Sequence, residues 1–464
     1  MRLDKLSLLG CVMSALAFFT INVHAQELSV DFTRQIGEIR ALNGVNLWAP
    51  LSCETLESHQ ADAEECHFST VRLHDVPWDN NGLRLVDVHQ IFGNLKADAD
   101  DPDNYFFEPT DDYIANILKG GAVPIYRLGT SIEHSTRKYF AHKPDDMEHY
   151  AAICAGIVRH YNAGWANGFE WNLPYWEIWN EPDLVPQMWD GDWDSYCQFY
   201  VVVAKRLRME FPDIKIGGPA LTNSGPAGRD MIKRLAELCK KEGAPLDFVS
   251  WHCYARTPED IVSQPAIMRQ TLDEAGFPDA ELHLNEWHYF PCTWAEIQRS
   301  IESKVEWYAR PDGTHGYVSA AFNDFVLTRW QDTPLTMSNY YSFTFKDWGT
   351  IDADGLKRPT YYSFKLFGEL AHYSPKRVQT TDENGSVALL GGVDADGGSK
   401  RLLVSIFKRE ETDPIKIALK GVPEKGTVDV ARIAPDGFNE TRFDYAEGVL
   451  MLDSVDSGVY LVRF

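Results

Sequence analysis

The sequence lacks the short motifs that identify several large classes of enzyme. It has no HExxH run for a catalytic metal, no GxSxG nucleophile turn, no P-loop and no GxGxxG segment opening a βαβ unit. None of its eight cysteines forms a CxxC pair, so a structural zinc site is not expected. We therefore predict a protein that uses neither a metal nor an organic cofactor.

The sequence is also short of positive charge. It has 44 Lys and Arg against 68 Asp and Glu, a formal net charge of −24 at pH 7. Such acidity argues against nucleic acid and anionic membranes as partners, and makes a densely anionic polymer an unfavourable substrate. The acidic segment 96–112 does not fit an EF-hand calcium loop, because Pro102 and Asp103 take the fifth and sixth positions counted from Asp98. We interpret it as a solvated loop.

Long apolar runs are absent outside the N-terminus. Arg2 and Lys5 precede an apolar run over 6–23, and Ala25 ends a short cleavage-like site before Gln26. We predict a signal peptide at residues 1–25 and a secreted or periplasmic protein. A lipoprotein signal ending at Cys11 is rejected because most of the apolar run follows that cysteine. No later stretch approaches the roughly 20 apolar residues of a membrane span.

Seven cysteines remain after residue 25. An oxidising compartment favours a Cys53–Cys66 bridge that closes a short surface loop. The odd number leaves at least one thiol unpaired or paired between molecules.

Apolar segments with strand and helix periodicity alternate along the first 375 residues. Helical spacing falls at 111–119, 147–161, 196–211, 230–242, 258–274, 319–329 and 361–371. Strand patterns precede or separate these at 42–48, 70–75, 123–128, 175–179, 214–218, 247–252, 281–286 and 339–345. Eight strands alternating with helices predict an α/β fold, a (β/α)₈ TIM barrel over residues 41–375.

Residues 376–464 have a different character. Short alternating runs at 386–390, 401–407, 415–419, 427–431 and 458–464 are separated by Gly, Asp and Pro, which is typical of a β-sandwich. Since only about six strands are expected there, we predict that the N-terminal segment 26–40, through a strand at 28–32, completes one of its sheets. The sequence has no internal repeat and no low-complexity linker, so the two domains are expected to pack rigidly.

The segment Trp176-Glu-Ile-Trp-Asn-Glu-Pro-Asp183 begins as an alternating strand and ends in Asn180, Glu181 and Pro182. Proline has no amide proton and usually ends a strand ladder. An amide and a carboxylate at the carboxyl end of a barrel strand lie where such barrels place their active sites. A solvated surface acid is the alternative for any single Glu, but Glu181 lies in a tryptophan-rich segment.

A second carboxylate, Glu286, ends the seventh predicted strand. Glycoside hydrolysis requires two carboxylates that face each other across the anomeric carbon. Strands four and seven approach from different sides of the barrel, so Glu181 and Glu286 are the predicted catalytic pair.

Further polar and aromatic residues follow other strands. Arg72 and His74 end strand two, where Arg72 can act electrostatically on the carboxylates and His74 can bind a ring hydroxyl. Arg72 could instead neutralise buried acids. On strand six, His252 can donate to sugar hydroxyls and the Tyr254 hydroxyl can hydrogen-bond Glu286. After strand eight, Tyr341, Phe345 and Trp348 could form a stacking floor, although each ring alone could equally belong to the core.

These residues together resemble glycoside hydrolase family 39, which includes β-xylosidases and α-L-iduronidases. The resemblance covers about residues 42–370. It rests on the Trp176–Asp183 segment, Val71-Arg-Leu-His74, Asp247-Phe-Val-Ser-Trp-His-Cys-Tyr254, Asn285-Glu286 and Lys357-Arg-Pro-Thr-Tyr-Tyr-Ser-Phe-Lys365. The Asn-Glu-Pro motif is shared by a wider clan of retaining barrel enzymes, so it is more specific for the chemistry than for the family.

The resemblance implies Glu181 as acid/base, Glu286 as nucleophile and Asn180 as a partner of the sugar 2-hydroxyl. It places His74, His252 and Tyr254 in the sugar subsite. The sequence differs from the expected pattern at Cys253 and at Trp287-His-Tyr289, and we expect these differences to bear on the sugar bound. The predicted function is a retaining glycosidase that removes terminal sugars, most simply β-xylosides, from oligosaccharides. An α-L-iduronidase, a galactosidase, an endo-acting hydrolase and a non-catalytic carbohydrate-binding protein remain alternatives, and the oligomeric state is open.

Overall fold

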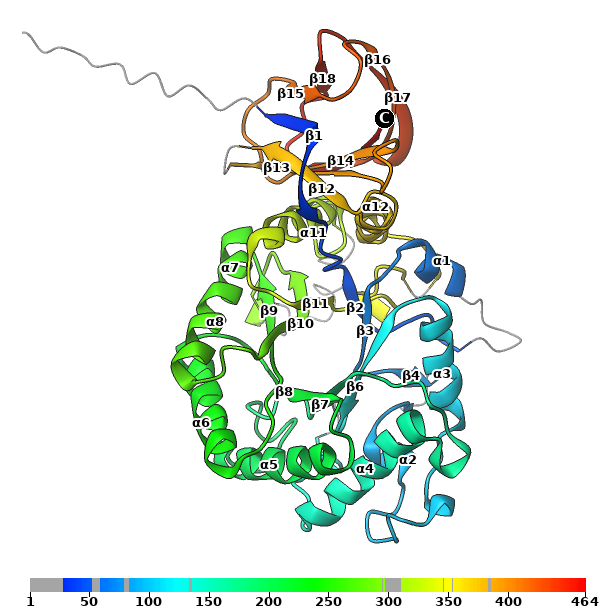
Figure 1. Ribbon diagram of the computed structural model, residues 1–464, viewed down its shortest axis with the longest axis vertical. Coiled ribbons are helices and arrows are strands. Elements are labelled where there is room, and N and C mark those ends of the chain that lie inside the picture. The colour runs from blue at the N-terminus through cyan, green and yellow to red at the C-terminus, as the bar shows by residue number, and fades with distance from the viewer. Residues whose placement is uncertain are drawn as a thin grey trace, which may run out of the picture.

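The computed structural model describes residues 28–51, 59–78, 83–132, 136–293, 295–296, 310–344, 346–352, 354–382 and 385–464. Its centre is a closed barrel of parallel strands in the order β10-β11-β2-β3-β6-β7-β8-β9 (Figure 1). The strands are β2 (Gly44–Asn46), β3 (Thr70–Leu73), β6 (Val123–Leu128), β7 (Tyr175–Ile178), β8 (Lys215–Leu221), β9 (Phe248–Ala255), β10 (Glu281–Tyr289) and β11 (Met337–Tyr340). The predicted TIM barrel is confirmed.

Helices surround this barrel. They are α1 (Gln60–Glu65), α2 (Val88–Ile91), α3 (Glu108–Lys119), α4 (Met147–Ala163), α5 (Trp193–Glu210), α6 (Pro226–Glu242), α7 (Pro258–Val262), α8 (Gln264–Ala275), α11 (Tyr317–Arg329) and α12 (Pro359–Tyr373). A small hairpin of β4 (Pro77–Trp78) and β5 (Leu83–Arg84) follows β3. None of the helices in the described residues is long and apolar enough to cross a bilayer.

Several predicted elements differ in extent from those observed. The helix predicted over 258–274 is two helices divided at Ser263, because Pro265 near the start of α8 has no amide proton to continue the first one. The eighth strand ends at Tyr340, five residues earlier than predicted.

The second domain is one mixed, mostly antiparallel nine-stranded sheet in the order β17-β16-β19-β14-β13-β12-β1-β15-β18. Its strands are β1 (Ser29–Glu38), β12 (Lys376–Thr381), β13 (Val387–Val393), β14 (Lys400–Ile406), β15 (Ile415–Lys420), β16 (Gly426–Ala434), β17 (Gly437–Tyr445), β18 (Val449–Leu452) and β19 (Gly458–Arg463). The N-terminal β1 is antiparallel to β12 and parallel to β15, so the two ends of the chain share this sheet (Figure 1).

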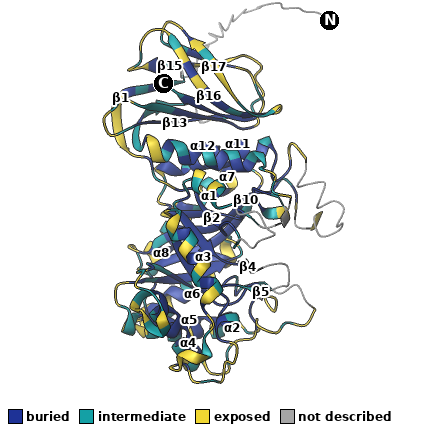
Figure 2. Ribbon diagram, turned by 90° about the vertical axis from the view of Figure 1, so that its right-hand side faces the viewer, coloured by how far each residue is buried: buried dark blue, intermediate teal, exposed yellow. Residues whose placement is uncertain are grey.

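The two faces of this sheet pack against different partners. Val387 and Leu389 of β13 belong to the domain's own core, while the alternate residues Ala388 and Leu390 join the core of the barrel. Helices α11 and α12 lie between the sheet and the barrel (Figure 2). Glu369 of α12 accepts hydrogen bonds from Arg401 and Arg463 of the sheet. The domains therefore share one continuous apolar interface.

Cys66 forms no disulfide, so the predicted Cys53–Cys66 bridge is wrong. Cys66 is a buried free thiol at the end of α1, and burial raises its pKa. Cys53 lies outside the described residues, as do residues 1–27 with the predicted signal peptide. Cys154, Cys197, Cys239, Cys253 and Cys292 are also buried free thiols.

Candidate active site

Glu181 sits on a sharp turn at the carboxyl end of β7. Trp179 and Glu181 both have left-handed backbone (φ 73° and 46°), which is costly for residues with a Cβ atom. The backbone is fixed on both sides: Trp179 N donates to Leu128 O of β6 (2.9 Å), and Glu181 N donates to Ala220 O of β8 (3.0 Å). The turn leaves the Glu181 side chain 17 % exposed at the barrel mouth.

Glu286 lies within β10 and is held by donors to each of its oxygens. Arg72 Nη1 donates to Oε1 at 2.8 Å, and the Tyr254 hydroxyl donates to Oε2 at 2.9 Å. The sequence-based expectation of a Tyr254–Glu286 hydrogen bond is thus met in the structure. Two donors fix the orientation of the carboxylate and favour its charged form.

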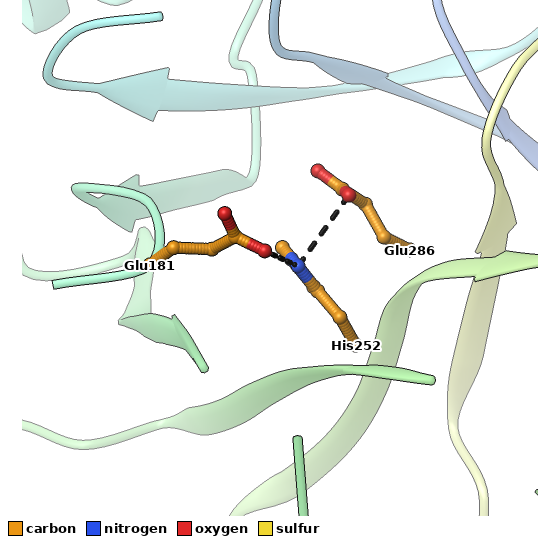
Figure 3. Close-up of side chains that lie close together, drawn as sticks. All are labelled: Glu181, His252 and Glu286. Atoms are coloured by element: carbon orange, nitrogen blue, oxygen red, sulfur yellow. Dashed lines mark hydrogen bonds and ion pairs between the residues drawn. The ribbon is translucent and has the colours of Figure 1, made fainter. Parts of the chain in front are cut away.

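His252 of β9 joins the two carboxylates (Figure 3). Its Nδ1 lies 2.8 Å from Glu181 Oε1 and 3.4 Å from Glu286 Oε2. One oxygen of each carboxylate and this nitrogen all lie within 4.8 Å of one another. The two carboxylates therefore converge on one small space, and His252 contacts them directly where the sequence suggested contacts with sugar hydroxyls.

Arg72 is the hub of the buried network beneath this space. Its Nε donates to Glu177 Oε2 and its Nη2 donates to Asn180 Oδ1, both at 2.6 Å, in addition to the bond to Glu286. Glu177 also accepts from Ser250 Oγ (2.6 Å) and from the Asn285 amide. Both alternatives for Arg72 are thus realised, because it neutralises the buried Glu177 and also contacts the candidate catalytic residues.

The surroundings shift the pKa values of Glu181, Glu286 and His252 in different ways. Burial, helped by the negative charge of Asp183, raises the pKa of Glu181 to about 8. Burial also raises the pKa of Glu286, but the nearby His252 and Arg72 oppose that rise. Burial lowers the pKa of His252 to about 4, so this imidazole is neutral at pH 7. Glu181 is accordingly the carboxyl group that holds a proton at neutral pH.

The remaining predicted residues lie around this centre. His74 is buried with Nε2 3.9 Å from Glu286 Oε1, and burial holds the pKa of His74 well below its usual value. Trp348 packs edge-on to Tyr254 with ring centroids 5.7 Å apart. The Tyr341 hydroxyl donates to Asp75 Oδ2 at 2.9 Å, while Phe345 lies outside the described residues.

Cys253 and Trp287, which were expected to bear on the sugar bound, do not face the catalytic centre. Side chains alternate along a strand, so the residues next to inward-facing neighbours point to the surrounding helices. Gln264 of α8 donates to Cys253 Sγ at 2.9 Å. The Trp287 ring packs against Trp330 and Phe364 on the outer side of the barrel.

Sequence reasoning did not select Glu177 and Asp75 as site residues. Glu177 is fully buried, and Asp75 accepts from Tyr341 and from Ile132 N (3.2 Å), which ties three loops of the mouth together. Glu177 could have been recognised in the sequence as a charged residue at an inward-facing position of an otherwise apolar strand. A charged residue in such a position requires a buried partner.

Glu181, His252 and Glu286 are also the one group of side chains in the described residues spaced closely enough to hold a metal ion. However, His252 Nδ1 is already at hydrogen-bonding distance from Glu181, and Glu286 already accepts from Arg72 and Tyr254. We interpret the group as a hydrogen-bonded cluster.

An eight-stranded parallel barrel with two facing carboxylates at the ends of its fourth and seventh strands, one protonated and one held by cationic and phenolic donors, defines a glycoside hydrolase. The family model of Glycosyl hydrolases family 39 matches residues 40–401. The chain belongs to that family, which confirms the resemblance drawn from its motifs.

Individual relatives agree with this assignment. A β-xylosidase from Caldicellulosiruptor saccharolyticus is 22 % identical over 460 residues, covering 90 % of this chain and 86 % of the relative. A solved glucosidase from Croceicoccus marinus superposes with a TM-score of 0.75 at 22 % identity, covering 95 % of this chain and 98 % of that one. A monomeric β-xylosidase from Caulobacter crescentus gives a TM-score of 0.68 at 17 % identity, covering 95 % and 99 %.

Replacing Arg72 with Met should destabilise the protein strongly, because Glu177 and Glu286 would then be buried without their shared cation. Removing one partner of a buried ion pair costs about 3–5 kcal/mol of unfolding free energy. Arg442, whose ion pair with Asp429 is exposed, gives the matched control, and Arg442→Met should cost less than about 1 kcal/mol. Urea denaturation followed by tryptophan fluorescence measures both. Equal losses in the two variants would contradict the central role of Arg72.

Proposed function

We propose that this protein is a retaining glycosidase that removes terminal sugars from β-xylosides by double displacement. The observation that carries the proposal is the convergence of Glu181 and Glu286, with oxygens no more than 4.8 Å apart. Retaining enzymes hold their carboxyl groups about 5–5.5 Å apart, whereas inverting enzymes leave about 6.5–9.5 Å for a water molecule. The β-xylosidase relatives support xylosides as the substrate.

In the first step, a Glu286 oxygen attacks the anomeric carbon and forms a glycosyl ester. The bond from that carbon to the leaving oxygen breaks, and the proton of Glu181 passes to this oxygen. The raised pKa of Glu181 supplies the proton at neutral pH, and the donors Arg72 and Tyr254 keep Glu286 charged and aimed. In the second step the Glu181 carboxylate takes a proton from water. That water attacks the anomeric carbon, and the ester bond to Glu286 breaks.

Asn180 is the proposed contact to the sugar 2-hydroxyl. Its Oδ1 is already bonded to Arg72, which leaves the NH₂ group of the amide as the donor for a hydroxyl oxygen. Such a contact strengthens in the transition state of glycoside cleavage. His74, beside Glu286, is the proposed partner of a second ring hydroxyl.

A β-glucoside is the second candidate substrate, because the Croceicoccus marinus glucosidase gives the higher TM-score of the two compared structures. An α-L-iduronide is less suited to a chain with a net charge of −24. Initial rates on a panel of nitrophenyl glycosides separate these substrates, with the highest kcat/KM expected on the β-xyloside.

Glu286→Gln should lower kcat on a nitrophenyl β-xyloside by roughly a thousandfold or more, because the amide cannot form the glycosyl ester. The isosteric change keeps the acceptor for Arg72 or Tyr254, so circular dichroism should match the parent. For the unmodified protein, NMR of the first-formed sugar should show retained anomeric configuration. Full activity in the variant, or an inverted product, would refute the double displacement.

The value of kcat/KM should fall as the pH rises through about 8, where Glu181 loses its proton. Because the charge of Asp183 raises that pKa, Asp183→Asn should move the alkaline limb to lower pH. Asparagine retains an oxygen to accept from Thr222 N, as Asp183 does. The exposed Asp194 gives a control, and Asp194→Asn should leave the limb in place. An alkaline limb that does not move in Asp183→Asn would contradict this assignment.

We also propose that the protein is exported, on the basis of the charged and apolar N-terminal 25 residues. Mass spectrometry of the exported protein should find Gln26 as the first residue, whereas an intact Met1 would contradict export by this signal.

A further inference from the structure

A hollow of about 610 Å³ is lined in part by the loop that carries Glu181 and is not used by the mechanism above. Thr130 and Trp179, which line it, come within two residues of the ends of the barrel strands β6 and β7, so the hollow lies at the same end of the barrel as Glu181. The start of α4 closes its other side. The polar and aromatic residues that line it include Lys96, Tyr139, Phe140, Lys143, Asp145 and Asp190.

The walls of the hollow are fixed by contacts between the two loops that form it. Asp190 N donates to Ala141 O at 2.8 Å, and His142 Nδ1 lies 2.7 Å from Asp190 Oδ2. At the floor, the Trp179 indole donates to Met188 O at 2.7 Å. Since Trp179 and Asp190 belong to the loop that also carries Glu181, the hollow and the acid group are parts of one structural unit.

The rim presents aromatic rings to solvent. Tyr139 is 58 % exposed and Phe140 is 43 % exposed. The Phe140 ring stacks on His89 with centroids 3.5 Å apart and an interplanar angle of 6°, which holds it in one orientation. Exposed aromatic rings held at a concave surface among hydrogen-bonding groups are typical of binding sites.

Two other cavities in the described residues differ from this one. One, of about 490 Å³, lies at the opposite end of the barrel, beside Lys215 and Glu281 at the starts of β8 and β10. The other, of about 420 Å³, lies between the barrel and the second domain, beside Arg358 and Gly437. Neither has an exposed aromatic ring among its lining residues.

We propose that this hollow is a second carbohydrate-binding site, which holds a sugar ring of an oligosaccharide outside the catalytic centre. The apolar C–H face of the sugar packs on Phe140 and Tyr139, and its hydroxyls bond the lysine, aspartate and histidine side chains of the wall. Lys96 and Lys143 are nearly balanced by Asp145, Asp146 and Asp190, which favours a neutral sugar over a polyanionic one. This inference rests on the proposed glycosidase function for its ligand class.

The test uses the Glu286→Gln protein, which binds oligosaccharides without consuming them. Isothermal titration with xylohexaose and with cellohexaose compares this parent with the added change Phe140→Ala or Tyr139→Ala. We expect each change to weaken binding of at least one of the two sugars by about fivefold or more, as loss of a central aromatic contact does. Phe140→Tyr should restore the affinity. The control is Phe106→Ala, because Phe106 is similarly exposed (49 %) but lies outside the hollow.

The same changes in the active protein show whether the catalytic centre is intact. Phe140→Ala should hydrolyse a nitrophenyl β-xyloside within about twofold of the parent. If Phe140→Ala also lowers kcat/KM on xylohexaose, the bound ring belongs to the leaving part of the oligosaccharide that is being cleaved. If kcat/KM on xylohexaose is unchanged, the bound ring belongs to a separate stretch of polymer. Both results support the site. The site would be overturned if Phe140→Ala and Tyr139→Ala bind both hexasaccharides as tightly as the Phe106→Ala control does. If the parent protein hydrolyses none of the glycosides, the proposed function is overturned instead.

Discussion

The guanidinium group of Arg72 is the point on which the catalytic geometry depends. It is fully buried, and its three nitrogens donate to Glu177, Asn180 and Glu286, which come from two other strands of the barrel. The planar group fixes the directions of its donors, so these three side chains cannot turn independently. Glu177 supplies the counter-charge that offsets the cost of burying the Arg72 cation. The second carboxylate, Glu286, therefore remains available for chemistry.

Two carboxylates with different environments follow from this arrangement. Glu286 accepts hydrogen bonds from a cation and a phenol, while Glu181 lies on a strained turn, is mostly enclosed by protein, and is close to the charge of Asp183. The neutral His252 touches both and allows them to approach without a fixed charge between them. A difference in proton affinity between two nearby acids is the property that divides the roles of acid and nucleophile.

The second domain supports the barrel from outside the site. Helices α11 and α12 bury one side against the barrel and the other against β13, β14, β16 and β19, so they cover the face of the sheet that is turned to the barrel. The N-terminal strand β1 completes this sheet before the chain enters the barrel at β2. The first and last strands of the chain are thereby held in one sheet, on the side of α11 and α12 away from the barrel.

The sequence by itself determined the eight-stranded barrel, the all-β character of the C-terminal region and the positions of Glu181 and Glu286, because periodicity and strand-end chemistry are local properties of the chain. It did not determine the strands β12, β17 and β18, because β12 and β17 consist mostly of polar residues with few buried side chains, and β18 spans only four residues. Tertiary structure alone decided that His252 bridges the carboxylates, that Glu177 pairs with Arg72, and that Cys253 and Trp287 face away from the catalytic centre. These facts depend on which strand faces which across a closed barrel and on a left-handed turn at Glu181, and neither is encoded in the spacing of residues along one segment.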